Sequence, residues 1–89
     1  MAEDAPSLLD FPTSFPIKVM GRREGGFAQG VMEIVLKHAP DYDASTVEMR
    51  ASREARYLSV TCTIRATSRE QLDNLYRELS SHPMVKMVL

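Results

Sequence analysis

The stretch Tyr57–Thr67 reads Tyr-Leu-Ser-Val-Thr-Cys-Thr-Ile-Arg-Ala-Thr, and this segment decides the fold. From position 58 to 66, apolar residues alternate with hydroxyl-bearing or charged ones, and many of the side chains are β-branched. A period of two is typical of a strand that places one face on a core and the other toward solvent. We therefore predict one long central strand around which the other elements pack.

Similar patterns on either side predict five further elements. Alternation marks 15–21, 46–51 and 84–89 as strands, while apolar residues three and four apart mark 27–38 and 68–82 as helices. Pro40 ends the first helix, His82-Pro83 ends the second, and Thr67 with Glu70 predicts a capping box at the second helix's start. The connection before Tyr57 lacks an Asn-Gly or Asp-Gly pair, which predicts a loose loop of several residues.

The order of these elements is strand, helix, strand, strand, helix, strand. Two split β-α-β units with right-handed crossovers place the first and third strands in the middle of the sheet. The predicted fold class is α+β, with a ferredoxin-like βαββαβ sandwich in which two helices cover one face of a four-stranded antiparallel sheet. One face of the sheet is then left open.

Length and composition limit the range of functions. The chain has 89 residues, which predicts one domain over 11–89, and the mostly polar first ten residues predict a flexible tail over 1–10. The net charge of −1 predicts no nucleic-acid partner. A domain of this size has a small core, so a homodimer would stabilise it. The only cysteine, Cys62, has the alternation of a core residue. The absence of a signal peptide and of a membrane span predicts a cytoplasmic protein without membrane contact.

Several short motifs, in order, resemble the YbeD-like family of small bacterial proteins. They are Phe11-Pro12-Thr13, Lys18-Val19-Met20-Gly21, His38-Ala39-Pro40, Tyr57-Leu58-Ser59-Val60, Ala66-Thr67 and Val85-Lys86-Met87-Val88-Leu89. The resemblance implies a ferredoxin-like fold related to ACT regulatory domains, a bacterial cytoplasmic protein and no established activity. Genes of that family often lie near one for lipoyl-group transfer. The family pattern carries a glycine in the turn before the long strand, where this chain has Arg53-Glu54-Ala55-Arg56.

Catalytic and metal chemistry find little support in the sequence. The exposed face of the long strand offers hydroxyls and Arg65 but no aromatic on which RNA bases would stack, unless Tyr57 serves at the strand's end. Acylphosphatase-type catalysis requires an asparagine that orients water, and the only asparagine, Asn74, lies on the predicted second helix, which is the wrong place. His38 and His82 both fall at helix ends, where a structural role is the simpler interpretation. We expect no catalytic residue, no metal site and no cofactor.

The segment Gly21–Gly26 is the strongest candidate for a ligand site. Glycines allow the backbone to approach a ligand, the next helix begins with free N–H groups, and two arginines add positive charge. A carboxylate or phosphate would suit Gly21, Arg22, Arg23, Gly25 and Gly26, although a solvated loop is the simpler alternative. The segment is not a P-loop, because the Gly-Lys-Ser/Thr ending is missing.

The open face of the sheet is the candidate interface. We expect it to expose Met20, Met84 and Val88 beside Lys18 and Lys86, and we expect the last strand to be an unprotected edge. The sequence therefore favours a non-enzymatic regulatory or adaptor module acting on an unidentified protein partner. The alternative is an ACT-like sensor that binds a small anionic metabolite at 21–26.

Overall fold

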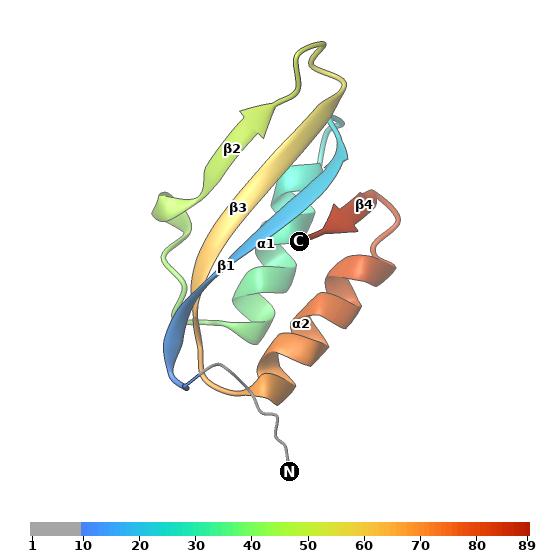
Figure 1. Cartoon of the computed structure of the whole chain (residues 1–89). Coiled ribbons are helices and arrows are strands. Elements are labelled where there is room, and N and C mark those ends of the chain that lie inside the picture. The colour runs from blue at the N-terminus through green and yellow to red at the C-terminus, as the bar shows by residue number, and fades with distance from the viewer. Residues whose placement is uncertain (1–9) are drawn as a thin grey trace.

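The structure is a computed structural model that describes residues 10–89 (Figure 1). The predicted tail over 1–10 therefore lies, apart from Asp10, outside the described residues. The elements are β1 (Thr13–Arg22), α1 (Phe27–His38), a 3₁₀ turn η1 (Ala44–Thr46), β2 (Glu48–Ala51), β3 (Tyr57–Ala66), α2 (Arg69–Ser81) and β4 (Val85–Val88). The predicted βαββαβ order is confirmed.

The strand order in the sheet is β2-β3-β1-β4, and every neighbouring pair is antiparallel. β1 and β3 pair along their whole lengths, from Thr13 opposite Ala66 to Arg22 opposite Tyr57. The long strand β3 is central, as its pattern predicted, and β2 and β4 form the two edges. Because β1 and β3 run antiparallel, the end of β1 lies beside the start of β3, which brings two distant loops together.

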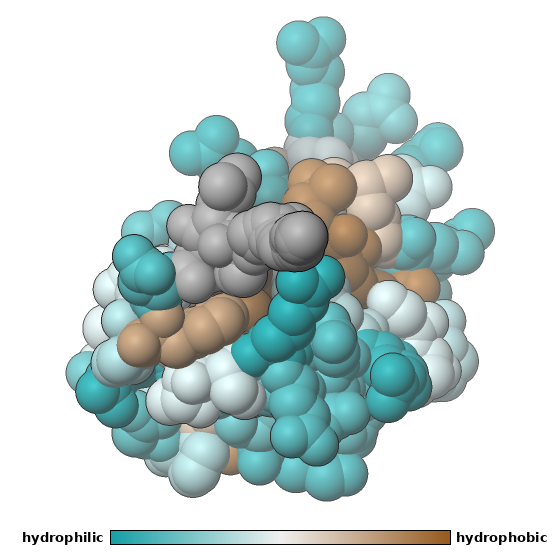
Figure 2. Space-filling model, turned by 60° about the horizontal axis from the view of Figure 1, so that its bottom comes forward, coloured by the Kyte–Doolittle hydropathy of each residue, from teal (hydrophilic) through white to brown (hydrophobic). Residues whose placement is uncertain are grey.

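Both helices lie on the same side of the sheet (Figure 1). The even-numbered residues of β3 and the odd-numbered residues of β1 face them, so the alternation of the sequence becomes the division between core and open face. Seen from the lower end of Figure 1, the surface is mostly polar, and apolar side chains reach it close to where the described chain begins (Figure 2). The fully buried side chains that fill the centre include Ile17, Val19, Phe27, Val31, Val60, Cys62, Ile64, Leu75 and Leu79.

Tyr42 is a core residue that the sequence pattern missed. Tyr42 lies in the polar loop after α1, yet only 8% of its surface is exposed, and its hydroxyl has no hydrogen-bond partner among the described residues. Burial raises its pKa, and it raises that of the Cys62 thiol as well. A protonated, inaccessible thiol is a poor nucleophile, so the predicted structural role of Cys62 agrees with its surroundings.

The start of α2 differs by one residue from the predicted capping box. Ser68, rather than Thr67, is the N-cap, and its hydroxyl accepts a hydrogen bond from the Gln71 amide at 3.0 Å. The Gln71 side chain in turn accepts from the Thr67 amide at 2.7 Å. Both Thr67–Glu70 and Ser68–Gln71 have the required spacing, and the structure uses the later pair.

Candidate functional site

Gly21 is a packing residue and does not belong to a ligand site. It is buried at the end of β1, and a Cβ atom placed on it would overlap the carbonyl oxygen of Met84 and the ring of Phe27. Only glycine lets β1, α1 and the segment before β4 approach this closely. The structure therefore removes Gly21 from the predicted anion site, because it faces the core.

Of the other two glycines of the loop, only Gly26 shapes the start of α1. Gly26 is the N-cap, with a φ of 92° in the left-handed region, and its carbonyl accepts from the Gly30 amide at 2.9 Å. Gly25 lies in open space. Gly30, within α1, lies against His82, since an added Cβ would come within 3.0 Å of Nε2 of that ring.

Arg22 and Arg23 are exposed, and they border a pocket of about 360 Å³ at the end of β1. The Arg23 amide donates to the Arg56 carbonyl at 2.8 Å, which ties the β1–α1 loop to the β2–β3 loop. A third arginine thereby joins the two that the sequence singled out. The pocket is lined by Arg22, Arg23, Glu24, Ala55, Arg56 and Tyr57, so neither Gly25 nor Gly26 takes part in it.

Sequence reasoning missed Arg56 and Tyr57, although a signal was present. An antiparallel pairing of the first and third strands places Arg22 opposite Tyr57, so the residues on either side of Tyr57 had to lie beside the arginine pair. Ala55 adopts a φ of 58°, a conformation that favours glycine. This explains in physical terms why a glycine would suit the turn. The segment 52–56 between β2 and β3 confirms the expected loop of several residues.

The open face of the sheet is rich in positive charge. Strand pairing places Lys18 opposite Thr61, Arg50 opposite Ser59 and Arg22 opposite Tyr57, all on the face away from the helices. Arg65 and the acidic Glu48 lie on the same face. Within residues 10–89, none of these four cations is in an ion pair. Among the described residues, the strands therefore place four cations and one acid on this face, although the whole chain has a net charge of −1.

The predicted interface residues of β4 are partly wrong. Val88 lies opposite Val19 and packs, like Met84, against the core rather than on the open face. The pairing shifts between Met20 and Gly21, so that Gly21 lies opposite Val85 and Lys86 is the extra, exposed residue of a β-bulge. A bulge moves the following side chains to the other face, and the alternation alone does not reveal one.

Met87 and Leu89 take the places that were assigned to Met84 and Val88. Met87 lies opposite Met20, and Leu89 exchanges two backbone hydrogen bonds with Lys18, of 3.1 and 2.8 Å. Both residues are therefore on the open face, where 51% of Met87 and 59% of Leu89 is exposed. We call Met20, Met87 and Leu89 the apolar strip. Of the predicted interface residues, Met20 keeps its place on this face and Lys86 is exposed at the bulge.

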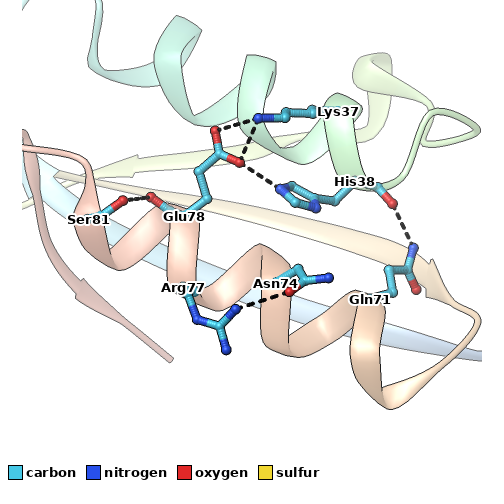
Figure 3. A network of polar contacts seen from close by, with 7 residues as sticks. All are labelled: Lys37, His38, Gln71, Asn74, Arg77, Glu78 and Ser81. Atoms are coloured by element: carbon cyan, nitrogen blue, oxygen red, sulfur yellow. Dashed lines mark hydrogen bonds and ion pairs between the residues drawn. The ribbon is translucent and has the colours of Figure 1, made fainter.

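A polar network joins the two helices on their outer side (Figure 3). The Glu78 carboxylate accepts from Nε2 of His38 at 2.8 Å and lies 3.1 Å from Nζ of Lys37. Gln71 donates from its amide to the His38 carbonyl at 2.9 Å. His82 accepts from the Met84 amide at 3.1 Å through Nδ1. Both histidines thus have structural partners, although His38 pairs with a side chain rather than capping its own helix.

This network predicts a pH dependence of stability. The hydrogen bond from His38, with that from Lys37, holds the pKa of Glu78 below its ordinary value of 4.5. A lowered folded-state pKa stabilises the protein above the unfolded value, and the effect is lost as pH falls through the folded value. We expect Glu78→Gln to lower the Tm at pH 7 and to melt together with the unmutated protein near pH 3. A constant difference in Tm across this range would contradict the assignment.

Two findings concern the described part of the chain only. No helix within residues 10–89 is long and apolar enough to cross a membrane. In the same range, no three His, Cys, Asp or Glu side chains come together as metal ligands would.

Comparison with known proteins identifies the family. The model of a family described as "Protein of unknown function (DUF493)" matches residues 6–89. The chain belongs to this family. A UPF0250 protein of Nitrosomonas europaea is 57% identical over 83 residues, which is 93% of this chain and 95% of that protein. A UPF0250 protein of Chromobacterium violaceum is 46% identical over the full length of both chains. The resemblance to the YbeD-like family is thereby confirmed.

Solved structures extend the comparison to the fold of this DUF493 protein. The ACT domain from GTP pyrophosphokinase of Chlorobium tepidum superposes with a TM-score of 0.66 at 19% identity, over 86% of this chain and 97% of that one. Protein HP0495 from H. pylori gives a TM-score of 0.71 at 10% identity, over 98% and 91% of the two chains. At these identities the likeness concerns the fold, which is ACT-like and ferredoxin-like.

Proposed function

We propose that this DUF493 protein is a non-enzymatic adaptor or regulatory module of the bacterial cytoplasm, which docks a partner protein on the open face of its sheet. One observation carries the proposal: the apolar strip of Met20, Met87 and Leu89 lies uncovered beside Lys18. Methionine side chains adapt to different surfaces, and a contiguous exposed apolar patch marks an interaction site more often than chance.

The charges of the open face indicate what kind of surface a partner would present. An acidic surface would be attracted by the four cations Lys18, Arg22, Arg50 and Arg65. Glu48 is the only acid that the described strands place on the same face. A suitable partner therefore presents carboxylates around a small apolar contact. The resemblance to the YbeD-like family implies a gene that often lies near one for lipoyl-group transfer, so proteins of lipoate metabolism are the first partners to test.

The experiment compares two variants that add the same charge. Met87→Lys with Leu89→Lys alters the apolar strip, and Gln29→Lys with Ser80→Lys alters exposed helix positions. We expect the strip variant to lose partner proteins that the unmutated protein captures from its own cells, while the helix variant keeps them. Identical capture by all three proteins, each folded by circular dichroism, would refute docking on the open face.

A sensor of small anionic metabolites is the second candidate, and the arginine pocket favours it. Arg22, Arg23 and Arg56 surround a space of about 360 Å³ with Tyr57, a size suited to a small carboxylate or phosphate. The site differs from the predicted loop, because Arg56 and Tyr57 replace the glycines.

The sensor is tested by ligand-dependent melting. Inorganic phosphate and citrate are expected to raise the Tm of the unmutated protein, and the triple variant Arg22→Ala, Arg23→Ala, Arg56→Ala should lose this rise. The variant Arg69→Ala with Arg77→Ala removes arginines from α2 and should retain it. No anion-dependent rise in the unmutated protein would remove the support for this function.

A further inference from the structure

The outer edge of β2 is free to pair with another strand. All four residues of β2 are exposed, and the strand lies at the border of the sheet (Figure 1). The Ser52 amide donates to the Tyr57 carbonyl at 2.8 Å, and bonded pairs in an antiparallel ladder recur every second residue. Glu48 and Arg50 therefore direct their backbone groups toward β3, and Met49 and Ala51 direct theirs outward.

β4, which was expected to be an unprotected edge, is protected by a bulge, and the unprotected edge is β2. β4 carries the bulge at Lys86, and a bulge together with a lysine discourages pairing with a further strand. β2 pairs with β3 in an uninterrupted register from Glu48 to Ala51. Any extension of the sheet is thus expected at β2.

We propose that β2 pairs with β2 of a second copy of this chain, antiparallel and with Met49 opposite Met49 of the second copy. This register places Glu48 opposite Arg50 of the second copy, and the two-fold axis repeats that pair. Glu48 and Arg50 share the open face, so both pairs join opposite charges directly across the strands. Neither residue is in an ion pair within 10–89 of its own chain.

Charge also excludes the neighbouring registers. A pairing centred on Arg50 would set two arginines directly opposite each other, which is unfavourable. A pairing centred on Ala51 would set Arg50 opposite Ser52 of the second copy and Glu48 opposite Glu54. Only the register centred on Met49 uses the outward backbone groups and pairs both charges.

The side of β2 that faces the helices also favours pairing with a second copy of this chain. Met49 lies opposite Val60, on the side of the helices, yet 56% of its surface is exposed. On α1, Met32 contacts β3, the strand next to β2, and its sulfur is 3.8 Å from that of Cys62. Pairing would bury Met49 against its symmetry mate, and a methionine side chain adapts readily to such a contact. The dimer would also join two open faces into one surface.

Charge reversal tests the register in solution. We expect the unmutated protein to dimerise in analytical ultracentrifugation, and Glu48→Arg or Arg50→Glu alone to weaken the dimer about tenfold or more. The swap of both, Glu48→Arg with Arg50→Glu, restores opposite charges and should restore the dimer. A monomer at all concentrations, or a swap no better than the single variants, would overturn the proposal.

Cross-linking provides an independent measurement on the full chain. Opposed residues in a bonded antiparallel pair have Cα atoms about 5.5 Å apart, a distance that a disulfide spans. Under mild oxidation Met49→Cys should therefore give a covalent dimer. Ala51→Cys is the matched control, since two residues at 51 would lie about 14 Å apart along the strands. Cross-linking at 51 but not at 49 would refute the register.

Discussion

Gly21→Ala is expected to lower the free energy of unfolding by about 3 kcal/mol. The added methyl group would overlap the Met84 carbonyl and the Phe27 ring, which are parts of two different elements. The carbonyl belongs to the backbone before β4, so relief of the overlap requires the sheet edge or α1 to move. Urea unfolding followed by circular dichroism measures the change.

Gly25→Ala is the matched control for this substitution. It lies four residues further along, nothing approaches its added Cβ within 4 Å, and its φ is not positive. We expect a change within about 0.5 kcal/mol, as for an ordinary surface position. Equal losses at both positions would show that the glycine-rich loop is sensitive as a whole, and that Gly21 has no special packing role.

The sequence was sufficient for those parts of the fold that depend on periodicity. The alternation in β3 and the apolar stripe of α1 each reflect burial against a single core, and the structure places both as predicted. Pro40 and His82-Pro83 also marked the ends of the helices correctly, because proline removes the N–H that a helix needs.

The candidate sites depended on features that periodicity does not record. The bulge at Lys86 reverses the faces of β4, which exchanges Val88 for Met87 on the open face. Tyr42 is buried from within a polar loop, and no regular spacing marks it. Arg56 reaches the arginine pocket through a backbone contact between two loops, which only the strand pairing predicts.

Glycine illustrates the same limit. In the sequence, Gly21 and Gly25 look alike, as members of one flexible loop. In the structure, the first is required by close packing and the second has free space around it. The distinction depends on which atoms of other elements lie beside each Cα atom, and the sequence does not record these neighbours. A ligand-binding interpretation of the whole segment therefore could not separate the two glycines.

The largest loss of stability is expected for Phe27→Ala, at about 4 kcal/mol. Phe27 is fully buried and is the largest of the fully buried side chains among the described residues. Its ring closes the space beside Gly21 and fixes the start of α1 directly after the left-handed Gly26. Removing it leaves a cavity that the paired strands β1 and β3 cannot fill. In a domain of this size, the loss is a large part of the total stability.

Phe15→Ala tests whether this loss comes from complete burial rather than from the aromatic ring itself. Phe15 is half-buried and packs edge-to-face on Tyr76, with the ring centroids 6.4 Å apart. We expect a loss of about 1.5 kcal/mol there, because solvent can fill part of the space. Phe27→Leu should recover more than half of the loss, since leucine refills much of the cavity. If chemical denaturation instead gives equal losses for the two alanine variants, Phe27 is not the centre of the core, and the approach of α1 to β1 needs another explanation.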